Sequence, residues 1–413
     1  MAAGKSTVIV VVSDRSLAGV WKLRILVVCQ HYWPEPFRLT DICEELVNRG
    51  HHVTVLTGMP NYPMGELYEG YKKSANTTEV HNGVEIIRCR TIPRKTGTFW
   101  RALNYFSYSF FASRKAKKLS ADFDVVFTNQ TSPVMMSYPA IVYKKKHGKK
   151  VIMYAMDLWP ASLAAGGISP KSPVYKLFHK VSRYIYRRMD SILVTSSMFI
   201  HYLTEEFGIN QNKLKHLPQY AEDIFTEVTT IKDNTIDLMF AGNIGTAQSV
   251  ETIIKAAKLV TIPNVRWHIV GDGRELDNIK RMAEGIENVI FYGRVPLEQM
   301  PALYAKADAM LVTLMKDPVI SLTLPGKVQT CMAAGKPIIA AADGETYDTI
   351  TQAKCGFASP AEDAEALAGS VETFAKADAN QLGENSLNYF QKHFSRNNFF
   401  EILESELNEY TVH

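Results

Sequence analysis

Short apolar runs alternate with amphipathic segments along most of the chain. Residues 23–29 contain a continuous apolar run, at 25–29, of the kind found in buried parallel strands. Residues 40–50 carry a helical pattern that Thr40 can cap and Gly50 can end, and residues 52–57 are apolar again. This order predicts a βαβ unit. Further strands are predicted at 84–90, 124–129, 150–156 and 191–196, with helices between most of them.

The pattern breaks into a polar stretch over residues 218–234 and then starts again. The second series has predicted strands at 236–242, 265–271, 289–293, 309–314 and 337–341. The helices between them are predicted at 250–260, 276–284, 300–307 and 327–335, and a polar amphipathic helix follows from about Asn380. The chain is therefore expected to be an α/β protein with two doubly wound, Rossmann-like domains that face a central cleft, with ligand at the carboxyl edges of their strands.

These patterns divide the chain into five segments. We expect an N-terminal extension (1–22), a first Rossmann-like domain (23–220), a linker (221–234), a second Rossmann-like domain (235–385) and a C-terminal helix that crosses back to the first domain (386–413).

The charge distribution separates the two halves. The 413 residues include 46 Lys plus Arg and 42 Asp plus Glu, a net charge of only +4. Residues 1–22 carry +2, residues 23–220 carry +13 and residues 221–413 carry −11. A basic half and an acidic half indicate different partners, and the basic half could face phosphate, nucleic acid or an anionic membrane.

Composition excludes several classes of protein. Hydrophobic residues make up 46% and charged residues 21%, which excludes a disordered, collagen-like or coiled-coil chain. The five cysteines are odd in number and none stands in a CxxC spacing, so we expect no disulfide framework and no zinc site, and a reducing compartment fits. The longest apolar runs reach about five residues, against the ~20 of a spanning helix, and the start does not resemble a signal peptide.

Two glycine-containing loops in the second half each follow a predicted strand and open a helix. Gly242 and Gly245 stand in the first, and Gly271, Asp272 and Gly273 form the second. Glycine lets the backbone approach a ligand, and a helix N-terminus offers free N–H groups to phosphate. Either loop alone could be an ordinary strand-to-helix turn, but two in successive units favour a nucleotide or phosphate site.

The segment LPGK (324–327) gives a sharper prediction. Lys327 starts a helix, where a positive charge costs stability unless an anion offsets it. A phosphate contact would explain a lysine there, and a solvated lysine is the alternative.

In the first half, candidate residues follow two predicted strands. Glu35 and Arg38 come after the first strand, and Asp157 and Trp159 come after the strand that ends near Ala155. All four would then stand at the carboxyl edge of the sheet, facing the cleft. For Asp157 a helix N-cap is the alternative.

The basic excess is concentrated in residues 99–120, 143–150 and 171–190, and in the first of these it is interleaved with aromatic residues. This composition suits a surface that lies on anionic lipid. A buried aromatic core with solvated charges is the alternative, and no nucleic-acid-binding module is visible.

Two short motifs are discounted. The tetrapeptide GKST (4–7) matches the end of a phosphate-binding loop but lacks the preceding strand and first glycine. Asp122 and Asp124 have the spacing of a metal-binding pair but stand just before a strand, where acidic residues often end a loop. We therefore expect no metal.

Taken together, these residues resemble the family-4 glycosyltransferases, which have the GT-B fold. The resemblance covers residues 23–413, from GHHVTVLT, DLWPAS and LPQY in the first half to FAGNIG, VGDG, VIFYGRVP and CMAAGKPIIAA in the second. In appearance the chain is most similar to bacterial surface-polysaccharide transferases of the N-acetyl-fucosamine type, such as those of O-antigen and capsule clusters.

The resemblance implies a retaining, metal-independent hexosyltransferase of exopolysaccharide biosynthesis that uses a nucleotide sugar, such as a UDP-sugar, as donor and no cofactor. The second domain would bind the donor and the first a lipid-linked or growing saccharide acceptor. Catalytic roles fall to Asp157, Lys327 and Glu35, and acceptor contacts to Glu35, Arg38 and Trp159. The expected donor-binding residues are Gly242, Asn243, Gly245, Gln248, Gly271, Asp272, Gly273, Arg294, Pro325, Gly326, Lys327 and Thr330.

The chain departs from the family at the charged positions of that site. The family's two EX7E glutamates become Leu322 and Thr330, of which the second normally holds the donor ribose. The usual Arg and Lys of the phosphate loop become Asn243 and Gln248, so Lys327 and Arg294 would have to supply positive charge. These losses leave two alternatives open, a non-catalytic GT-B subunit and a UDP-sugar epimerase. A transferase would work in the cytoplasm, peripherally bound to the inner face of the cytoplasmic membrane, without nucleic acid.

Overall fold

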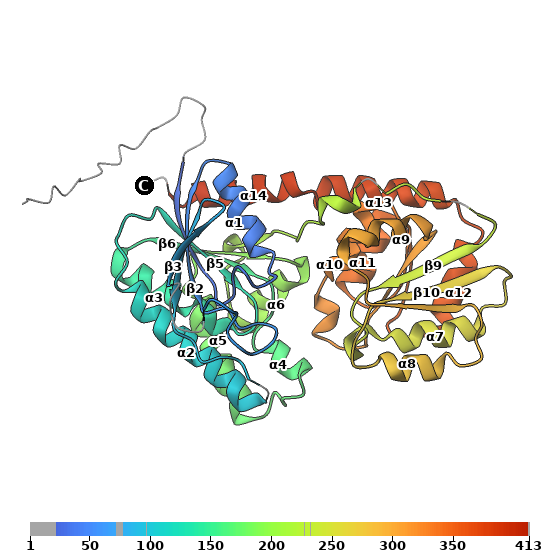
Figure 1. Cartoon of the computed structure of the whole chain (residues 1–413), viewed down its shortest axis with the longest axis horizontal. Helices are drawn as coiled ribbons and strands as arrows, with labels where there is room; N and C mark the ends of the chain where they lie inside the picture. The colour runs from blue at the N-terminus through green and yellow to red at the C-terminus, as the bar shows by residue number, and fades with distance from the viewer. Residues whose placement is uncertain (1–21, 72–76, 96, 227, 232, 412–413) are drawn as a thin grey trace, which may run out of the picture. The chain divides into compact units, whose positions relative to one another are not determined.

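The computed structural model describes residues 22–71, 77–95, 97–226, 228–231 and 233–411. The predicted N-terminal extension, with its GKST tetrapeptide, lies outside the described residues except for Lys22. By their internal contacts, the described residues form two compact units, one within residues 22–153 together with 406–411 and the other within residues 154–405. The strands belong to two separate sheets (Figure 1).

The first sheet has eight strands in the order β3-β4-β2-β1-β5-β6-β7-β8. β1 pairs in parallel with β2 and β5, β2 with β4 and β7 with β8, whereas β3 is antiparallel to β4. The strands are β1 (Arg24–Val28), β2 (His52–Gly58), β3 (Thr78–His81), β4 (Val84–Cys89), β5 (Val125–Gln130), β6 (Lys150–Ala155), β7 (Ser191–Val194) and β8 (Leu214–His216). The helices of this half are α1 (Leu39–Asn48), α2 (Thr98–Ala116), α3 (Tyr138–His147), α4 (Ala161–Ala165), α5 (Pro173–Tyr186) and α6 (Ser197–Phe207).

The second sheet has six strands in the order β11-β10-β9-β12-β13-β14, and all of its pairings are parallel. The strands are β9 (Ile236–Ala241), β10 (Val265–Val270), β11 (Val289–Gly293), β12 (Ala309–Thr313), β13 (Ile338–Ala341) and β14 (Gly356–Ser359). The helices are α7 (Val250–Leu259), α8 (Leu276–Met282), α9 (Met300–Lys306), α10 (Gly326–Ala333), α11 (Glu345–Ala353), α12 (Ala364–Phe374), α13 (Ala379–His393) and α14 (Arg396–Glu409).

Helices cover both faces of the second sheet (Figure 1). One apolar core lies between the sheet and α9, α10, α11 and α13, and the other between the sheet and α7, α8 and α12. The strand order reverses between β9 and β12, which is the switch point where an open parallel sheet forms a ligand crevice at its carboxyl edge.

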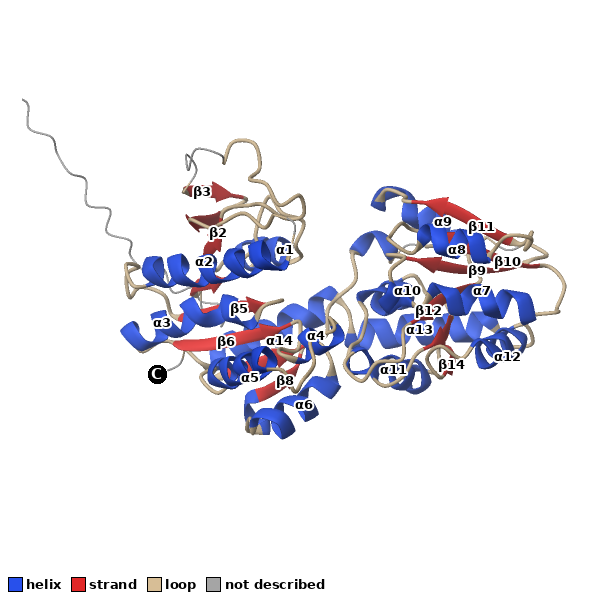
Figure 2. Cartoon of the chain, turned by 90° about the horizontal axis from the view of Figure 1, so that it is seen from below, coloured by secondary structure: helices blue, strands red, loops and turns tan. Residues whose placement is uncertain are grey.

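The alternation of strands and helices agrees with the sequence-based prediction (Figure 2). Three short strands were not predicted, β3, β8 and β14, because none of them is a continuous apolar run. The prediction that Thr40 caps a helix was wrong: α1 begins at Leu39, its N-cap position is Arg38, and no side chain caps it. A turn in which the Thr40 N–H donates to the Phe37 carbonyl leads directly into this helix.

Candidate functional site

The two glycine loops of the second sheet interlock at the carboxyl ends of β9 and β10. The Gly242 N–H donates to the Val270 carbonyl at 3.0 Å, and the Ile244 N–H donates to the Asp272 carbonyl at 2.8 Å. Gly271 has a φ of 139°, and a Cβ there would come within 1.8 Å of the Gly242 carbonyl oxygen. Only glycine permits this close approach, so the loops present backbone to the crevice at Gly242 and Gly271.

A cavity of about 640 Å³ opens above these loops. Its wall combines the glycine loops, the segment after β11, the N-terminal turns of α9 and α10, and a short segment before β9. The lining residues are Glu222, Phe225, Ala241, Gly242, Asn243, Val270, Gly271, Asp272, Gly273, Arg294, Val295, Leu297, Met300, Tyr304, Lys327 and Thr330.

Lys327 contributes a partly buried ammonium to this wall. Its Nζ donates a hydrogen bond to Gln248 Oε1 and lies 4.2 Å from the centroid of the Phe240 ring. Across the described residues, no carboxylate lies within ion-pair distance of it. Burial disfavours the charged form and lowers the pKa of Lys327 to about 8. A desolvated ammonium without an anionic partner favours a site for an anionic ligand.

The backbone of α10 adds to this positive end. Pro325 occupies its N-cap position, and no side chain caps the helix. Helix α10 therefore presents its uncapped N-terminal turn at the same wall as the Lys327 ammonium, and both attract negative charge.

Most of the donor-site residues predicted from the sequence share the cavity wall. These are Gly242, Asn243, Gly271, Asp272, Gly273, Arg294, Lys327 and Thr330. The other four, Gly245, Gln248, Pro325 and Gly326, are not among the lining residues, although Gln248 accepts the Lys327 hydrogen bond. The structure adds residues that sequence reasoning missed: Glu222 and Phe225 were assigned to a linker, and Leu297, Met300 and Tyr304 look like ordinary helix residues.

Glu35 is a buried carboxylate whose oxygens are already engaged. Glu35 Oε1 accepts from the N–H groups of Asn61 and Tyr62, both at 2.7 Å, and Oε2 lies 2.9 Å from His31 Nδ1. The side chain thus holds the loop after β2 against the segment after β1. Arg38 occupies the N-cap position of α1.

Asp157 and Trp159 follow β6, as predicted. Trp159 is buried, its backbone N–H donates to the Tyr186 hydroxyl at 3.2 Å, and its ring meets the Phe178 ring edge-on. Burial raises the pKa of Asp157 to about 6, although hydrogen bonds from Ser162, the Leu158 backbone and Trp159 oppose the rise. Asp157 therefore changes charge near neutral pH, as a catalytic acid or base requires.

The discounted motif Asp122–Asp124 has a structural position. Asp124 Oδ2 accepts from the Arg24 N–H at 2.7 Å, and the Asp124 N–H donates to the Arg24 carbonyl at 2.8 Å. These bonds tie the starts of β1 and β5 together, at the sheet edge opposite the carboxyl ends. Within the described residues, no group of three or more His, Cys, Asp or Glu side chains could hold a metal ion.

Two further findings concern the whole described chain. All five cysteines are buried and none forms a disulfide. Of the helices that the structure describes, none combines the length and apolarity needed to cross a membrane.

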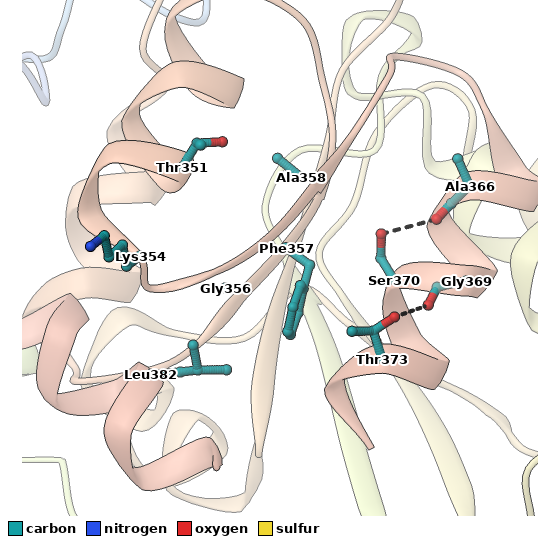
Figure 3. Close-up of a pocket in the computed structure, with 10 residues that line it drawn as sticks. All are labelled: Thr351, Lys354, Gly356, Phe357, Ala358, Ala366, Gly369, Ser370, Thr373 and Leu382. Atoms are coloured by element: carbon teal, nitrogen blue, oxygen red, sulfur yellow. Dashed lines mark hydrogen bonds between the residues drawn. The ribbon is translucent and has the colours of Figure 1, made fainter. Parts of the chain in front are cut away.

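A second cavity, also of about 640 Å³, lies beside the edge strand β14 (Figure 3). Its hydroxyls are occupied: Ser370 donates to the Ala366 carbonyl at 2.9 Å and Thr373 to the Gly369 carbonyl at 2.8 Å. Lys354 is exposed at its rim. Because the two cavities are equal in volume, their chemistry distinguishes them, and only the first combines glycine loops with a buried ammonium.

Comparison with known proteins gives two family matches that follow each other along the chain. Residues 38–219 match the model described as Glycosyltransferase Family 4, and residues 222–389 match the model described as Glycosyl transferases group 1.

The names of two curated relatives agree with these matches, and one solved structure shares the fold. The chain is 26% identical to the "Probable glycosyltransferase WbjE" of Pseudomonas aeruginosa, over 74% of this chain and 80% of that one. It is 24% identical to the "Putative colanic acid biosynthesis glycosyl transferase WcaI" of Escherichia coli K12, over 78% and 84%. The structure of Anabaena Alr3699/HepE in complex with UDP superposes with a TM-score of 0.69 at 14% identity, covering 94% of this chain and 100% of that one.

Proposed function

Since the chain carries a Glycosyltransferase Family 4 domain followed by a group 1 domain on the GT-B fold, we propose that it transfers a sugar from a UDP-sugar to a lipid-linked or growing saccharide acceptor with retention of configuration. The product would belong to a surface polysaccharide, a class that the name of the Escherichia coli relative, a putative colanic acid biosynthesis glycosyl transferase, suggests for that protein. No metal takes part in this proposal.

The observation that carries the proposal is the Lys327 ammonium at the wall of the glycine-loop cavity. The leaving group of the reaction is a nucleotide diphosphate, which gains negative charge as the sugar bond breaks. The Lys327 ammonium, the N-terminal N–H groups of α10 and the backbone of the loop at Gly242 would stabilise that charge where it develops. The Anabaena neighbour holds UDP in its own structure, which supports a uridine nucleotide.

The sugar would leave through an oxocarbenium-like transition state. Asp157, with its raised pKa, is the group that we assign to contact with the transferred sugar or the acceptor hydroxyl. Glu35 has the same assignment from the sequence, but its hydrogen bonds to Asn61, Tyr62 and His31 make it a positioning residue for the segment around it.

Helix α2 supports a lipid-linked acceptor and a position on an anionic membrane. Phe99, Phe106 and Phe110 are 68%, 51% and 55% exposed, and their spacing of seven and four residues places them on one face of the helix. Basic residues follow on the same helix, and the Arg114 guanidinium lies 5.3 Å from the Phe110 ring centroid. Exposed aromatic rings beside cations suit the headgroup region of a bilayer.

The test is incubation of the full chain with a panel of UDP-sugars and a lipid-diphosphate saccharide acceptor. Acceptor-dependent release of UDP, with a lengthened saccharide seen by mass spectrometry, is the expected result. Conversion of the donor to an isomer without acceptor, followed by NMR, would identify an epimerase instead. Absence of binding to every nucleotide sugar by calorimetry would contradict the proposal.

A further inference from the structure

The glycine-loop cavity contains a carboxylate that no predicted role uses. Glu222 lines this cavity, is half-buried, and stands immediately before the short helix η3 (Asp223–Phe225). Its neighbours Ala221 and Phe225 are both buried in the core that also contains α9 and α10. Because these neighbours are anchored, Glu222 is held at the cavity wall.

Two contacts place Glu222 at the α10 side of the cavity. The Phe225 ring packs against the Tyr304 ring with centroids 5.0 Å apart. The thiol of Cys331, which adjoins Thr330 in α10, is close enough to the Tyr304 hydroxyl to contribute to the raised pKa of Tyr304. Glu222 is also close enough to contribute to the raised pKa of Tyr304, after the larger effect of burial. The Glu222 carboxylate and the Thr330 hydroxyl therefore lie at the same end of the cavity.

Helix geometry relates this end to the diphosphate position. Lys327 and Thr330 both line the cavity and are three residues apart in α10, so their side chains lie on one face, about one turn apart. In a nucleoside diphosphate the ribose is joined directly to the phosphates. If Lys327 contacts the diphosphate, the next group along the nucleotide lies beside Thr330 and Glu222.

A ribose needs hydrogen-bond acceptors for its two adjacent hydroxyls. The Thr330 hydroxyl lies 3.2 Å from the Gly326 carbonyl and donates to it, which leaves one weak acceptor. The other carboxylate of the cavity wall, Asp272, accepts from the Gly273 N–H at 2.7 Å and belongs to the loop after β10 rather than to the segment packed on α9. A carboxylate can accept from both hydroxyls of a diol, as acidic residues do for ribose in Rossmann-type sites.

We propose that Glu222 supplies the carboxylate that binds the ribose diol of the donor nucleotide, and that Thr330 provides a second contact beside it. The inference rests on the proposed function, since it needs a nucleotide in the glycine-loop cavity. It assigns the ribose site to a residue outside α10, on the segment that leads into β9. The site thereby selects ribonucleotides over deoxyribonucleotides.

The experiment is calorimetry of the full chain with UDP and with 2′-deoxy-UDP. For the unmodified chain we expect UDP to bind about tenfold more tightly, the effect of one hydrogen bond to a charged group. In E222Q the affinity for UDP should fall by about that factor, and the preference over 2′-deoxy-UDP should shrink to about twofold or less. Glu298→Gln is the matched control, because Glu298 is exposed beside Leu297 and does not line the cavity.

The outcomes separate the two proposals. If the unmodified chain binds neither nucleotide, the proposed function fails. If it binds UDP but E222Q keeps the full preference over 2′-deoxy-UDP, the ribose assignment fails and the proposed function stands. Because both nucleotides are compared within each variant, a general loss of stability in E222Q changes both affinities and leaves their ratio interpretable.

Discussion

The Nζ of Lys327 lies 4.2 Å from the centroid of the Phe240 ring, so the ammonium rests on the face of an aromatic side chain. Phe240 belongs to β9 and Lys327 to the first turn of α10, which are 87 positions apart in the sequence. A cation over an aromatic face gains about 0.5–2 kcal/mol, less than an ion pair with a bound diphosphate would give. The ring and the Gln248 amide hold the ammonium in place without neutralising it.

Removal of this ammonium should weaken nucleotide binding. We expect Lys327→Met to reduce the affinity for UDP by roughly 10- to 150-fold, which corresponds to the ~1.5–3 kcal/mol of a hydrogen bond to a charged group. Calorimetry with UDP measures the change. Lys354→Met is the matched control, because Lys354 lies at the second cavity. The affinity of this variant for UDP should stay within twofold of that of the unmodified chain. Equal losses in both variants would contradict the assignment of the site.

Donor binding should weaken at alkaline pH. Burial lowers the pKa of Lys327 to about 8 in the empty site, and only the protonated amine attracts the diphosphate. As pH rises through 8 the free protein loses this charge, so the dissociation constant should be flat below about pH 7.5 and rise above pH 8. UDP-glucose is a suitable probe, since its diphosphate does not titrate in this range. In Lys327→Arg the guanidinium stays charged, and a rise of the same size there would rule out Lys327 as its origin.

Gln248 gives a second test of the same cation. Its Oε1 accepts the Lys327 hydrogen bond. Gln248→Glu should pair with the ammonium, raise the pKa of Lys327 and repel the diphosphate, so UDP should bind at least tenfold more weakly. Gln248→Lys should restore a second cation and bind UDP at least as tightly as the unmodified chain. Titration of both variants with UDP measures the two changes in affinity. Weaker UDP binding by Gln248→Lys together with stronger UDP binding by Gln248→Glu would refute the role of charge.

Asp157 should affect catalysis rather than donor binding. Asp157→Asn should lower kcat by about 10²–10⁴-fold, as expected for loss of an acid–base group, with the affinity for UDP unchanged. Its pKa of about 6 predicts that activity falls as pH drops below 6, because the carboxylate becomes protonated. Ser162→Ala removes a hydrogen bond that lowers this pKa, so the acid limb should move to higher pH. If the activity of Asp157→Asn fell at the same acidic pH as that of the unmodified chain, Asp157 would be excluded as the group whose protonation causes the loss of activity.

Helix α2 should bind anionic vesicles through its exposed aromatic face. We expect the double variant Phe106→Ser, Phe110→Ser to have a partition coefficient onto phosphatidylglycerol-containing vesicles at least tenfold lower than that of the unmodified chain. The reason is that burial of each Phe side chain in the bilayer contributes ~1.5–3 kcal/mol of binding free energy. Vesicle sedimentation measures the change. Leu259→Ser, at an exposed apolar site at the end of α7, is the control. Binding that persists in the double variant at unchanged strength would locate the membrane surface elsewhere.

Much of the glycine-loop cavity could be predicted from local sequence. Glycines after buried strands mark places where only backbone fits, and Gly242, Gly271 and Gly273 meet in the structure as that rule predicts. Lys327 was recognisable because a cation at a helix N-terminus is unfavourable unless an anion offsets it. Such signals depend on a residue and its immediate neighbours, so they can be read from the chain.

Other parts of the site carried no local signal. Glu222 lies in a polar stretch that resembles a linker, and only the packing of Phe225 on Tyr304 brings it to the cavity. The sequence assigned Glu35 a catalytic and acceptor-binding role, yet its partners Asn61 and Tyr62 come from the next loop along the sheet. A carboxylate with a structural role and a carboxylate that binds substrate cannot be distinguished in the sequence. The distinction depends on hydrogen-bond donors that are distant in the sequence and close in the fold.

The sequence by itself determined the two α/β halves, their opposite charges and the glycine loops, because hydrophobic periodicity and backbone freedom are properties of neighbouring residues. The tertiary structure decided which side chains share a wall. It placed the Lys327 ammonium on the face of Phe240 rather than beside a carboxylate, and it placed Glu222, which the sequence assigned to a linker, at the wall of the glycine-loop cavity. The residues concerned lie on or beside β9, α9 and α10, which are far apart in the sequence. They meet only because the parallel sheet brings these elements together at its switch point.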